Sequence, residues 1–197
     1  MSILNIFKKY TDFNQSCLGA ELGSGVTGSV FEFENKAIKL CINYELPNQS
    51  IIDFLIENKD LNFVKVFSHK LYGPYKDNGF PYKDHGYESI LSVIVMEKLL
   101  KISSDEEKVF HTILSHEDLN KKKNFSNSEL KKILKELSIG LDFDEGKVIF
   151  FYEGVRNSII YLSDIHQRNI MKDQLNNFKM VDCEFVKFKK RGLKCQK

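Results

Sequence analysis

The chain has 197 residues, of which 42% are hydrophobic and 28% are charged, and its 29 basic and 27 acidic residues leave a formal net charge of +2. This length is enough for one domain with a proper core or for two small lobes, but it excludes three full domains. The composition excludes a disordered chain. The small net charge gives no whole-protein field that would favour a nucleic-acid or membrane partner.

The four cysteines, Cys17, Cys41, Cys183 and Cys195, lie far apart and form no C-x-x-C pair. No apolar leader precedes them, and no cysteine–histidine spacing suggests zinc. No stretch approaches the roughly 18 uncharged apolar residues that a membrane span requires. We therefore expect a protein without a membrane partner, with reduced thiols, in the cytoplasm.

The first hundred residues predict mainly sheet. Residues 18–40 predict a strand, a glycine turn, a second strand and a third, because "SVFEF" alternates and "KAIKLCI" is a short apolar run. One helix follows, since residues 47–50 form a start signal and "SIIDFLIENK" has one apolar helical face. "FVKVFSHKLY" and "SILSVIVMEKLL" predict two further strands, separated by a loop over residues 73–86.

After residue 100 the pattern changes to helices. Ser104 followed by Glu107 has the spacing of a capping box, and "SNSELKKILKELSIGL" repeats that spacing ahead of an apolar helical face. A third helix is predicted from about Asp144 to Ile160, although "KVIFFY" inside it would also suit a strand. The change from sheet to helix falls within residues 95–103.

Three glycines stand at fixed offsets in "ELGSGVTGSVFEF", at Gly23, Gly25 and Gly28. Without a Cβ, glycine lets backbone N–H groups approach a bulky anion such as phosphate. The alternative is a hairpin whose turn needs residues that tolerate positive φ. Eleven residues after the last glycine, Lys39 interrupts the apolar third strand, so its side chain leaves the apolar face. It either contacts the same anion as the glycines or is an exposed strand lysine.

A second group of polar residues lies in "YLSDIHQRNIMKDQLNNFKMVDCEF". Asp164 is followed five residues later by Asn169, and Asp182 comes thirteen residues after that, at the end of an apolar, strand-like run. Oxygen ligands from Asp and Asn suit Mg²⁺, and a carboxylate can orient and deprotonate an attacking hydroxyl. Together with the glycines, these residues favour the transfer of a phosphoryl group.

In this order the motifs resemble those of the protein-kinase fold, in its small, atypical, phage-type versions. Its glycine-rich loop pattern G-x-G-x-x-G-x-V is matched by Gly23, Gly25, Gly28 and Val30. "KAIK" is similar to the strand motif that ends in a phosphate-pairing lysine, "VIVMEKL" resembles the hinge, and "DIHQRN" resembles the catalytic loop D-x-x-x-x-N. The resemblance covers residues 18–185, most of the chain.

The resemblance implies an α+β, bilobal protein-kinase-like fold. Its antiparallel-sheet N-lobe with one helix would span residues 1–98, and a reduced, mostly helical C-lobe would span residues 99–197. ATP and Mg²⁺ are the implied cofactors. The residues expected to bind the nucleotide are Gly23, Ser24, Gly25, Val26, Gly28, Val30, Lys39, Asp53, Met96, Glu97 and Leu99. The residues expected to act in catalysis are Lys39, Asp164 and Asn169, and the expected metal ligands are Asn169 and Asp182.

Some roles have alternatives. The carboxylate partner of Lys39 would lie on the single N-lobe helix, where Asp53 is better centred than Glu57. His166 is expected to brace the catalytic loop. Arg168 and Lys172 either neutralise the transferred phosphate or are solvated loop charges.

The sequence departs from the family at three points. "LSD" stands where H-R-D is usual, and Cys183 and Glu184 replace the Phe and Gly that follow the metal aspartate. No A-P-E segment or lower helical subdomain follows, on which typical protein kinases dock peptides. We favour an ATP- and Mg-dependent protein Ser/Thr kinase. The alternatives are a small-molecule kinase of the aminoglycoside or choline-kinase type, and a nucleotide-binding pseudokinase that acts by binding a partner.

The expected partners are ATP and a protein substrate, which is either the chain itself or a host protein. The location would be the host cytoplasm if a phage encodes the chain. For the tail "KFKKRGLKCQK" we prefer a solvated terminus to the alternative, a contact with nucleic acid or a phosphorylated partner. We therefore expect no nucleic-acid partner. The sequence indicates no oligomeric state.

Overall fold

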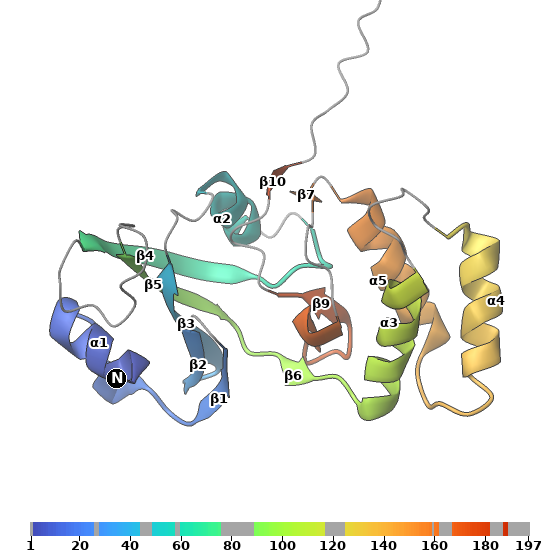
Figure 1. The fold of residues 1–197 in the computed structure, drawn as a ribbon, viewed down its shortest axis with the longest axis horizontal. Helices are drawn as coiled ribbons and strands as arrows, with labels where there is room; N and C mark the ends of the chain where they lie inside the picture. The colour runs from blue at the N-terminus through green and yellow to red at the C-terminus, as the bar shows by residue number, and fades with distance from the viewer. Residues whose placement is uncertain are drawn as a thin grey trace, which may run out of the picture. The chain divides into compact units, whose positions relative to one another are not determined.

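The computed structural model describes residues 2–25, 28–43, 49–57, 60–75, 89–116, 125–158, 160–161, 167–181 and 187–188. They form an α+β fold that divides into two compact units (Figure 1). The first unit comprises residues 1–59 and 64–98, and the second comprises residues 60–63 and 99–197. Residues 60–63, which the predicted division assigns to the first domain, belong to the second unit by their contacts.

The first unit is built on an antiparallel five-stranded sheet, which is compatible with a kinase-like N-lobe. Its strands are β1 (Glu21–Ser24), β2 (Gly28–Phe33), β3 (Lys36–Asn43), β4 (Val66–Tyr75) and β5 (Ser89–Glu97), and their order is β1-β2-β3-β5-β4. The predicted strands are therefore present. The predicted loop begins later than expected, because β4 continues to Tyr75, which pairs with Ser89 across a break in register.

A helix that the sequence interpretation did not include opens the chain. Helix α1 (Ile3–Tyr10) begins at Ser2, whose hydroxyl oxygen accepts a hydrogen bond from the Asn5 N–H, and a short 3-10 turn, η1 (Gln15–Cys17), follows it. Ile6 and Phe7 are fully buried in the core on one face of the sheet. The expectation of a single helix in this unit was therefore wrong. The predicted helix is present as α2 (Gln49–Ile56), and it packs against β4.

The second unit combines three helices with short strands. The helices are α3 (Ser104–His116), α4 (Asn127–Leu137) and α5 (Glu145–Asn157). A three-stranded sheet has the order β6-β8-β9, where β6 is Leu100–Lys101, β8 is Ile170–Lys172 and β9 is Phe178–Met180. A separate two-stranded ladder pairs β7 (Ile160–Tyr161) with β10 (Lys187–Phe188), and the 3-10 turn η3 (Gln167–Asn169) precedes β8.

The helix caps explain where these helices begin. The capping box predicted for α4 is confirmed, with Ser126 and Glu129 exchanging hydrogen bonds. At α3 the box lies one residue earlier than the spacing of Ser104 and Glu107 suggests. The Ser103 N–H donates to the Glu106 carboxylate (2.7 Å) and the Glu106 N–H donates to the Ser103 hydroxyl (3.2 Å). The adjacent serines and glutamates made both registers possible.

Three phenylalanines form the centre of the second unit. Phe110 of α3 meets Phe178 of β9 edge to face, with ring centroids 4.9 Å apart, and Phe151 of α5 completes the cluster at 5.5 and 6.0 Å. Such T-shaped contacts add to the stabilisation from apolar burial. The cluster joins α3 and α5 to the hairpin of β8 and β9.

Residues 60–63 are held in the second unit by a close approach to α5. The Met180 N–H donates to the Asn62 carbonyl (2.7 Å), and Phe63 forms a parallel bridge with Met180. A Cβ added at Gly154 of α5 would lie 2.0 Å from the Asn62 amide nitrogen. Glycine at this position therefore makes room for the buried Asn62.

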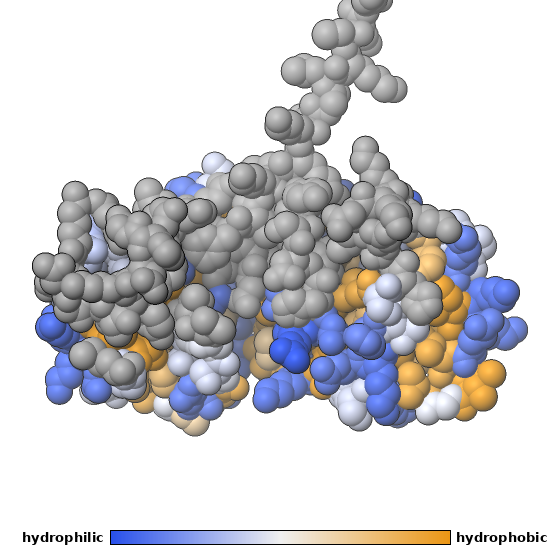
Figure 2. Space-filling view, in the orientation of Figure 1, coloured by the Kyte–Doolittle hydropathy of each residue, from blue (hydrophilic) through white to orange (hydrophobic). Residues whose placement is uncertain are grey.

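Hydrophobic side chains on the visible face lie among hydrophilic ones (Figure 2). The most exposed large hydrophobic residues of the second unit are Ile139, Leu175 and Phe150, at 87%, 75% and 64% exposure. Among the described residues, no helix is both long and apolar enough to cross a membrane.

Because Phe7 anchors α1 to the sheet, we predict that Phe7→Ala lowers the free energy of unfolding by about 3–5 kcal/mol, the usual result of deleting a fully buried aromatic ring. Urea titration of the fluorescence or circular dichroism signal measures it. The matched control is Lys8→Ala, because Lys8 is exposed on the same helix. Equal unfolding midpoints for the two variants would show that α1 adds nothing to the stability of the sheet.

Candidate functional site

Strand register brings several predicted site residues to one face of the sheet. Residues directly opposite each other in an antiparallel sheet share a face. Lys39 lies opposite Val30 of β2 and opposite Ile94 of β5. Two residues along, Ala37 lies opposite Met96. Val30, Lys39 and Met96 therefore project from the same side of the sheet, although they come from three strands.

The other side of the sheet is occupied by core residues. Ile38, Leu40 and Ile42 alternate with Lys39 along β3 and belong to the apolar cluster that includes Ile6 and Phe7 of α1. Helix α1 therefore covers the face opposite to Lys39. Ala37 is buried on the Lys39 face and is a site candidate that the sequence interpretation overlooked, although it stands inside the quoted "KAIK".

The three glycines of the loop have different structural reasons. A Cβ added at Gly28 would lie 2.6 Å from the Leu40 carbonyl oxygen of β3, so the sheet itself requires glycine there. A Cβ added at Gly23 or Gly25 would meet nothing within 4 Å, and neither residue has a positive φ. Packing within the described chain thus accounts for Gly28 but leaves Gly23 and Gly25 unexplained. Open space above two glycines is what an approaching ligand needs.

The hairpin tip is closed by a hydrogen bond from the Gly25 N–H to the Gly28 carbonyl (2.8 Å). The Gly25 N–H is therefore engaged within the tip, and an anion would have to use other N–H groups of the loop. Ser24 pairs with Ser29 at the ends of β1 and β2. Val26, also predicted to bind the nucleotide, lies outside the described residues.

Asp53 is exposed on α2, and its carboxylate accepts a hydrogen bond from the Gln49 amide one turn earlier (2.8 Å). Glu57, the alternative partner for Lys39, follows α2 and is also exposed. Lys39 itself is half-buried. Pairing of Lys39 with Asp53 stays a prediction, and the second carboxylate oxygen of Asp53 could accept from Lys39 while the first keeps its bond to Gln49.

The predicted hinge lies at the end of β5. The Glu97 N–H donates to the Lys65 carbonyl (3.0 Å), and its carboxylate accepts from the Lys65 N–H (2.7 Å). The Lys98 ammonium pairs with Glu32 of β2, and Leu99 is half-buried. Because the N–H and carboxylate of Glu97 are engaged at the start of β4, these groups are committed to holding β4 beside β5.

In the second unit, two ladders enclose both predicted catalytic segments. The chain runs through β7, residues 162–166, η3 and β8, then back through β9, residues 182–186 and β10. Since β7 pairs with β10 and β8 pairs with β9, both segments start and end at the same two ladders. Asp164, His166 and Asp182 belong to these segments and lie outside the described residues.

Asn169 is fixed at the end of the hairpin of β8 and β9. Its carbonyl accepts a hydrogen bond from the Val181 N–H (2.8 Å), which continues the ladder beyond the pair of Ile170 and Met180. Asp182 is the next residue in the chain. The described hairpin therefore ends at Asn169 and Val181, and Asp182 itself lies outside the described residues. Amide and carboxylate oxygens are donors of the kind that Mg²⁺ prefers.

Asp173 organises the turn of this hairpin. Its carboxylate accepts from the N–H groups of Leu175 and Asn177 (both 2.9 Å) and from the Asn177 amide (3.1 Å), and it lies 3.8 Å from the buried Lys179 ammonium. Burial raises the pKa of Asp173, but these hydrogen bonds and the charge of Lys179 outweigh burial. The pKa of Asp173 therefore lies below its ordinary value.

Of the two basic residues proposed near the transferred phosphate, Lys172 has a structural partner. Its ammonium lies 2.9 Å from the carboxylate of Glu106, and both side chains are largely buried. This ion pair ties β8 to the N-terminal cap of α3. Arg168 is exposed in η3. A solvated charge, one of the two readings offered for Lys172, is wrong.

No family model matches the sequence, and no curated protein matches it. Among solved structures, a complex of WbdD with a kinase inhibitor is 15% identical at a TM-score of 0.40, and a second WbdD structure is 14% identical at 0.40; each match covers 90% of this chain and 34% of WbdD. A third, described as the bifunctional kinase-methyltransferase WbdD, is 15% identical at 0.39 and covers 90% and 36%. This chain spans about a third of the length of those chains. The case for a function therefore comes from its own residues.

The glycine geometry predicts opposite effects for two substitutions. Gly28→Ala should destabilise the protein by about 1–3 kcal/mol, because the new Cβ meets the Leu40 carbonyl. Gly25→Ala should leave stability unchanged or raise it by up to about 1 kcal/mol. It should instead reduce the rise in melting temperature caused by Mg-ATP. Thermal melts with and without Mg-ATP measure both effects. A destabilised Gly25→Ala variant would contradict the open position found for this residue.

The lowered pKa of Asp173 predicts that this residue's contribution to the stability of the protein is lost in acid. A carboxylate with a lowered folded pKa stabilises the protein above its unfolded pKa of about 3.9, and this contribution is lost as the pH falls through the folded pKa. Asp173→Asn should therefore cost about 1–3 kcal/mol at pH 7, and the difference from the parent should shrink as the pH is lowered below about 4. Urea unfolding across this pH range measures it. Asp142→Asn, which removes an exposed loop carboxylate, serves as the control, and its free energy of unfolding at pH 7 should stay close to that of the parent.

Proposed function

We propose that the chain is an ATP- and Mg-dependent phosphotransferase that acts on a Ser or Thr hydroxyl of a protein. The observation that carries the proposal is the shared face of Val30, Lys39 and Met96, beside a hairpin whose Gly23 and Gly25 have open Cβ positions. A lysine, a glycine hairpin and an apolar wall suit the phosphates and the base of a nucleotide. The motif order found in the sequence supports the same function.

Each group of residues has a role in this proposal. Lys39 holds the phosphates nearest the base, and the backbone around Gly23 and Gly25 covers the terminal phosphate. Asn169 and Asp182 hold the metal. When bound, ATP supplies the phosphoryl group, and Mg²⁺ neutralises charge on its oxygens.

Asp164 orients the acceptor and takes its proton. The acceptor oxygen forms a bond to the terminal phosphorus as the bond from that phosphorus to the oxygen of ADP breaks, and the hydroxyl proton passes to the Asp164 carboxylate. The two ladders that bracket residues 162–166 and 182–186 support this division of roles, because they tie the base and a metal ligand to one framework.

The experiment that tests the proposal separates binding from chemistry. Asp164→Asn should leave ATP affinity nearly unchanged and lower phosphate transfer by about 10²–10⁴-fold, the usual contribution of a general base. Isothermal titration with Mg-ATP and transfer of labelled phosphate to protein mixtures are measured on one preparation. Asp142→Asn is the matched control and should keep both properties.

Other outcomes would replace the proposal. An equal loss of affinity and transfer would make Asp164 a structural residue. Nucleotide binding without any transfer by the parent protein would favour a pseudokinase that works through a partner. Transfer to an aminoglycoside, a sugar or choline, but to no protein, would favour a small-molecule kinase.

A further inference from the structure

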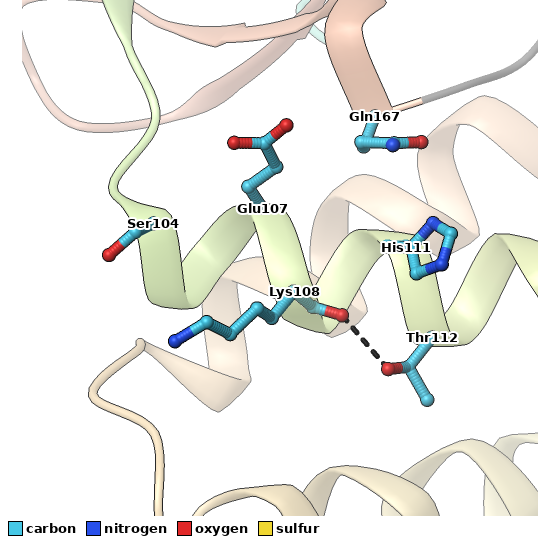
Figure 3. A pocket seen from close by; sticks show the side chains of 6 residues that line it. All are labelled: Ser104, Glu107, Lys108, His111, Thr112 and Gln167. Atoms are coloured by element: carbon cyan, nitrogen blue, oxygen red, sulfur yellow. Dashed lines mark hydrogen bonds between the residues drawn. The ribbon is translucent and has the colours of Figure 1, made fainter.

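A pocket of about 480 Å³, lined by polar and charged residues, lies within the second unit, between α3 and η3. Its described lining consists of Ser104, Glu107, Lys108, His111, Thr112 and Gln167. In Figure 3, Glu107 and His111 rise from α3 toward Gln167, which comes from η3. The pocket is thus walled partly by the segment that carries the predicted catalytic loop.

The lining residues leave one negative charge uncompensated. Lys108 is neutralised by Asp105, whose carboxylate lies 3.1 Å from its ammonium. The Asp142 N–H and Lys108 lower the pKa of Asp105, so Asp105 is ionised at neutral pH. Within the described part of the chain, no hydrogen bond or ion pair engages the carboxylate of Glu107, the imidazole of His111 or the amide of Gln167.

Glu107 has no duty in capping α3. The sequence spacing suggests that it pairs with Ser104, but the cap is formed by Ser103 and Glu106, and Glu106 also holds Lys172. Glu107 is exposed, and its backbone N–H is satisfied by the Ser103 carbonyl. Its side chain is therefore available to a ligand without any loss to the helix.

The wall that α3 contributes to the pocket, from Ser104 to Thr112, has the length of a short stretch of polypeptide. From Ser104 to Thr112 the helix rises about 12 Å, at 1.5 Å per residue. An extended peptide covers that length with three or four residues, at about 3.3 Å each. Gln167 is three residues from Asp164 in the sequence, a chain length of at most about 11 Å. The part of the wall formed by Gln167 therefore belongs to the same short stretch of chain as the proposed base.

We propose that this pocket binds the acceptor polypeptide, and that Glu107 selects a Lys or Arg side chain next to the Ser or Thr that receives phosphate. The inference rests on the proposed function for the phosphate transfer, but not for the binding. Glu107 supplies the opposite charge, and His111 and Gln167 supply hydrogen bonds to the peptide backbone or to polar side chains. Because the proposed ion pair between Glu107 and the basic side chain of the peptide is partly solvated, peptide binding should weaken as ionic strength rises.

The test measures peptide binding without requiring transfer. Two fluorescein-labelled octapeptides carry one serine, flanked by two lysines in the first and by two glutamates in the second. Fluorescence anisotropy with the full chain at low salt should show binding of the lysine peptide in preference to the glutamate peptide. Glu107→Gln should raise the dissociation constant for the lysine peptide by about two- to fivefold, as expected for an exposed ion pair. Glu107→Lys should reverse the preference.

Glu136→Gln is the matched control, because Glu136 is an exposed glutamate on α4 outside the pocket. It should bind the lysine peptide like the parent. Circular dichroism melts establish that all three variants fold. Unchanged binding in Glu107→Gln, an equal loss in Glu136→Gln, or no binding by the parent would overturn the proposal.

The same preparations separate this inference from the proposed function. Binding that depends on Glu107, without transfer of phosphate to the lysine peptide, would support the pocket and contradict the phosphotransferase. Transfer to that peptide with equal rates in parent and Glu107→Gln would contradict the pocket and support the phosphotransferase. Displacement of the lysine peptide by choline or an aminoglycoside at lower concentration than by unlabelled peptide would assign the pocket to a small amine and overturn the peptide assignment.

Discussion

The pairing register of β2, β3 and β5 is the constraint on which the candidate nucleotide face depends. Because side chains alternate along a strand, a slip of one residue would exchange the two faces of β3 and turn Lys39 into the apolar cluster. The bulk of Ile38, Leu40 and Ile42, packed with Phe7 of α1, opposes such a slip. The hydrophobic core therefore fixes the direction of a polar side chain on the opposite face of the sheet.

In the second unit, two largely buried ion pairs fix the position of the hairpin of β8 and β9. Lys172 with Glu106 joins β8 to the cap of α3, and Lys179 with Asp173 supports the hairpin turn. Removing one partner from such a pair leaves the other charge buried, which is costly. These contacts therefore hold the hairpin end at Asn169 in one arrangement, while the phenylalanine cluster supplies apolar burial around it.

Local patterns predicted the strands of the sheet, α2 and α4, because alternation and capping spacings are written in neighbouring residues. The choice between Ser103 and Ser104 as the cap of α3 could not be read in this way, since it involves Lys172, 66 residues from Glu106. The ambiguity of "KVIFFY" was resolved as α5 by the cap at Asp144. Helix α1 could have been predicted from Ser2 and the spacing of Ile3, Ile6 and Phe7. The pocket on α3 could not, because it needs Gln167 from η3.

The contacts of residues 60–63 interleave the two units along the chain. Asn62 and Phe63 belong with α5 and β9, while the residues on either side of this segment belong to the first unit. No single cut of the backbone can therefore yield both units complete, and a cut after residue 98 would leave the second without this segment. In evolution, the coding sequences of the two units would therefore have to be inherited together. A crossover at that point would have to match an asparagine from one parent to a glycine at position 154 from the other.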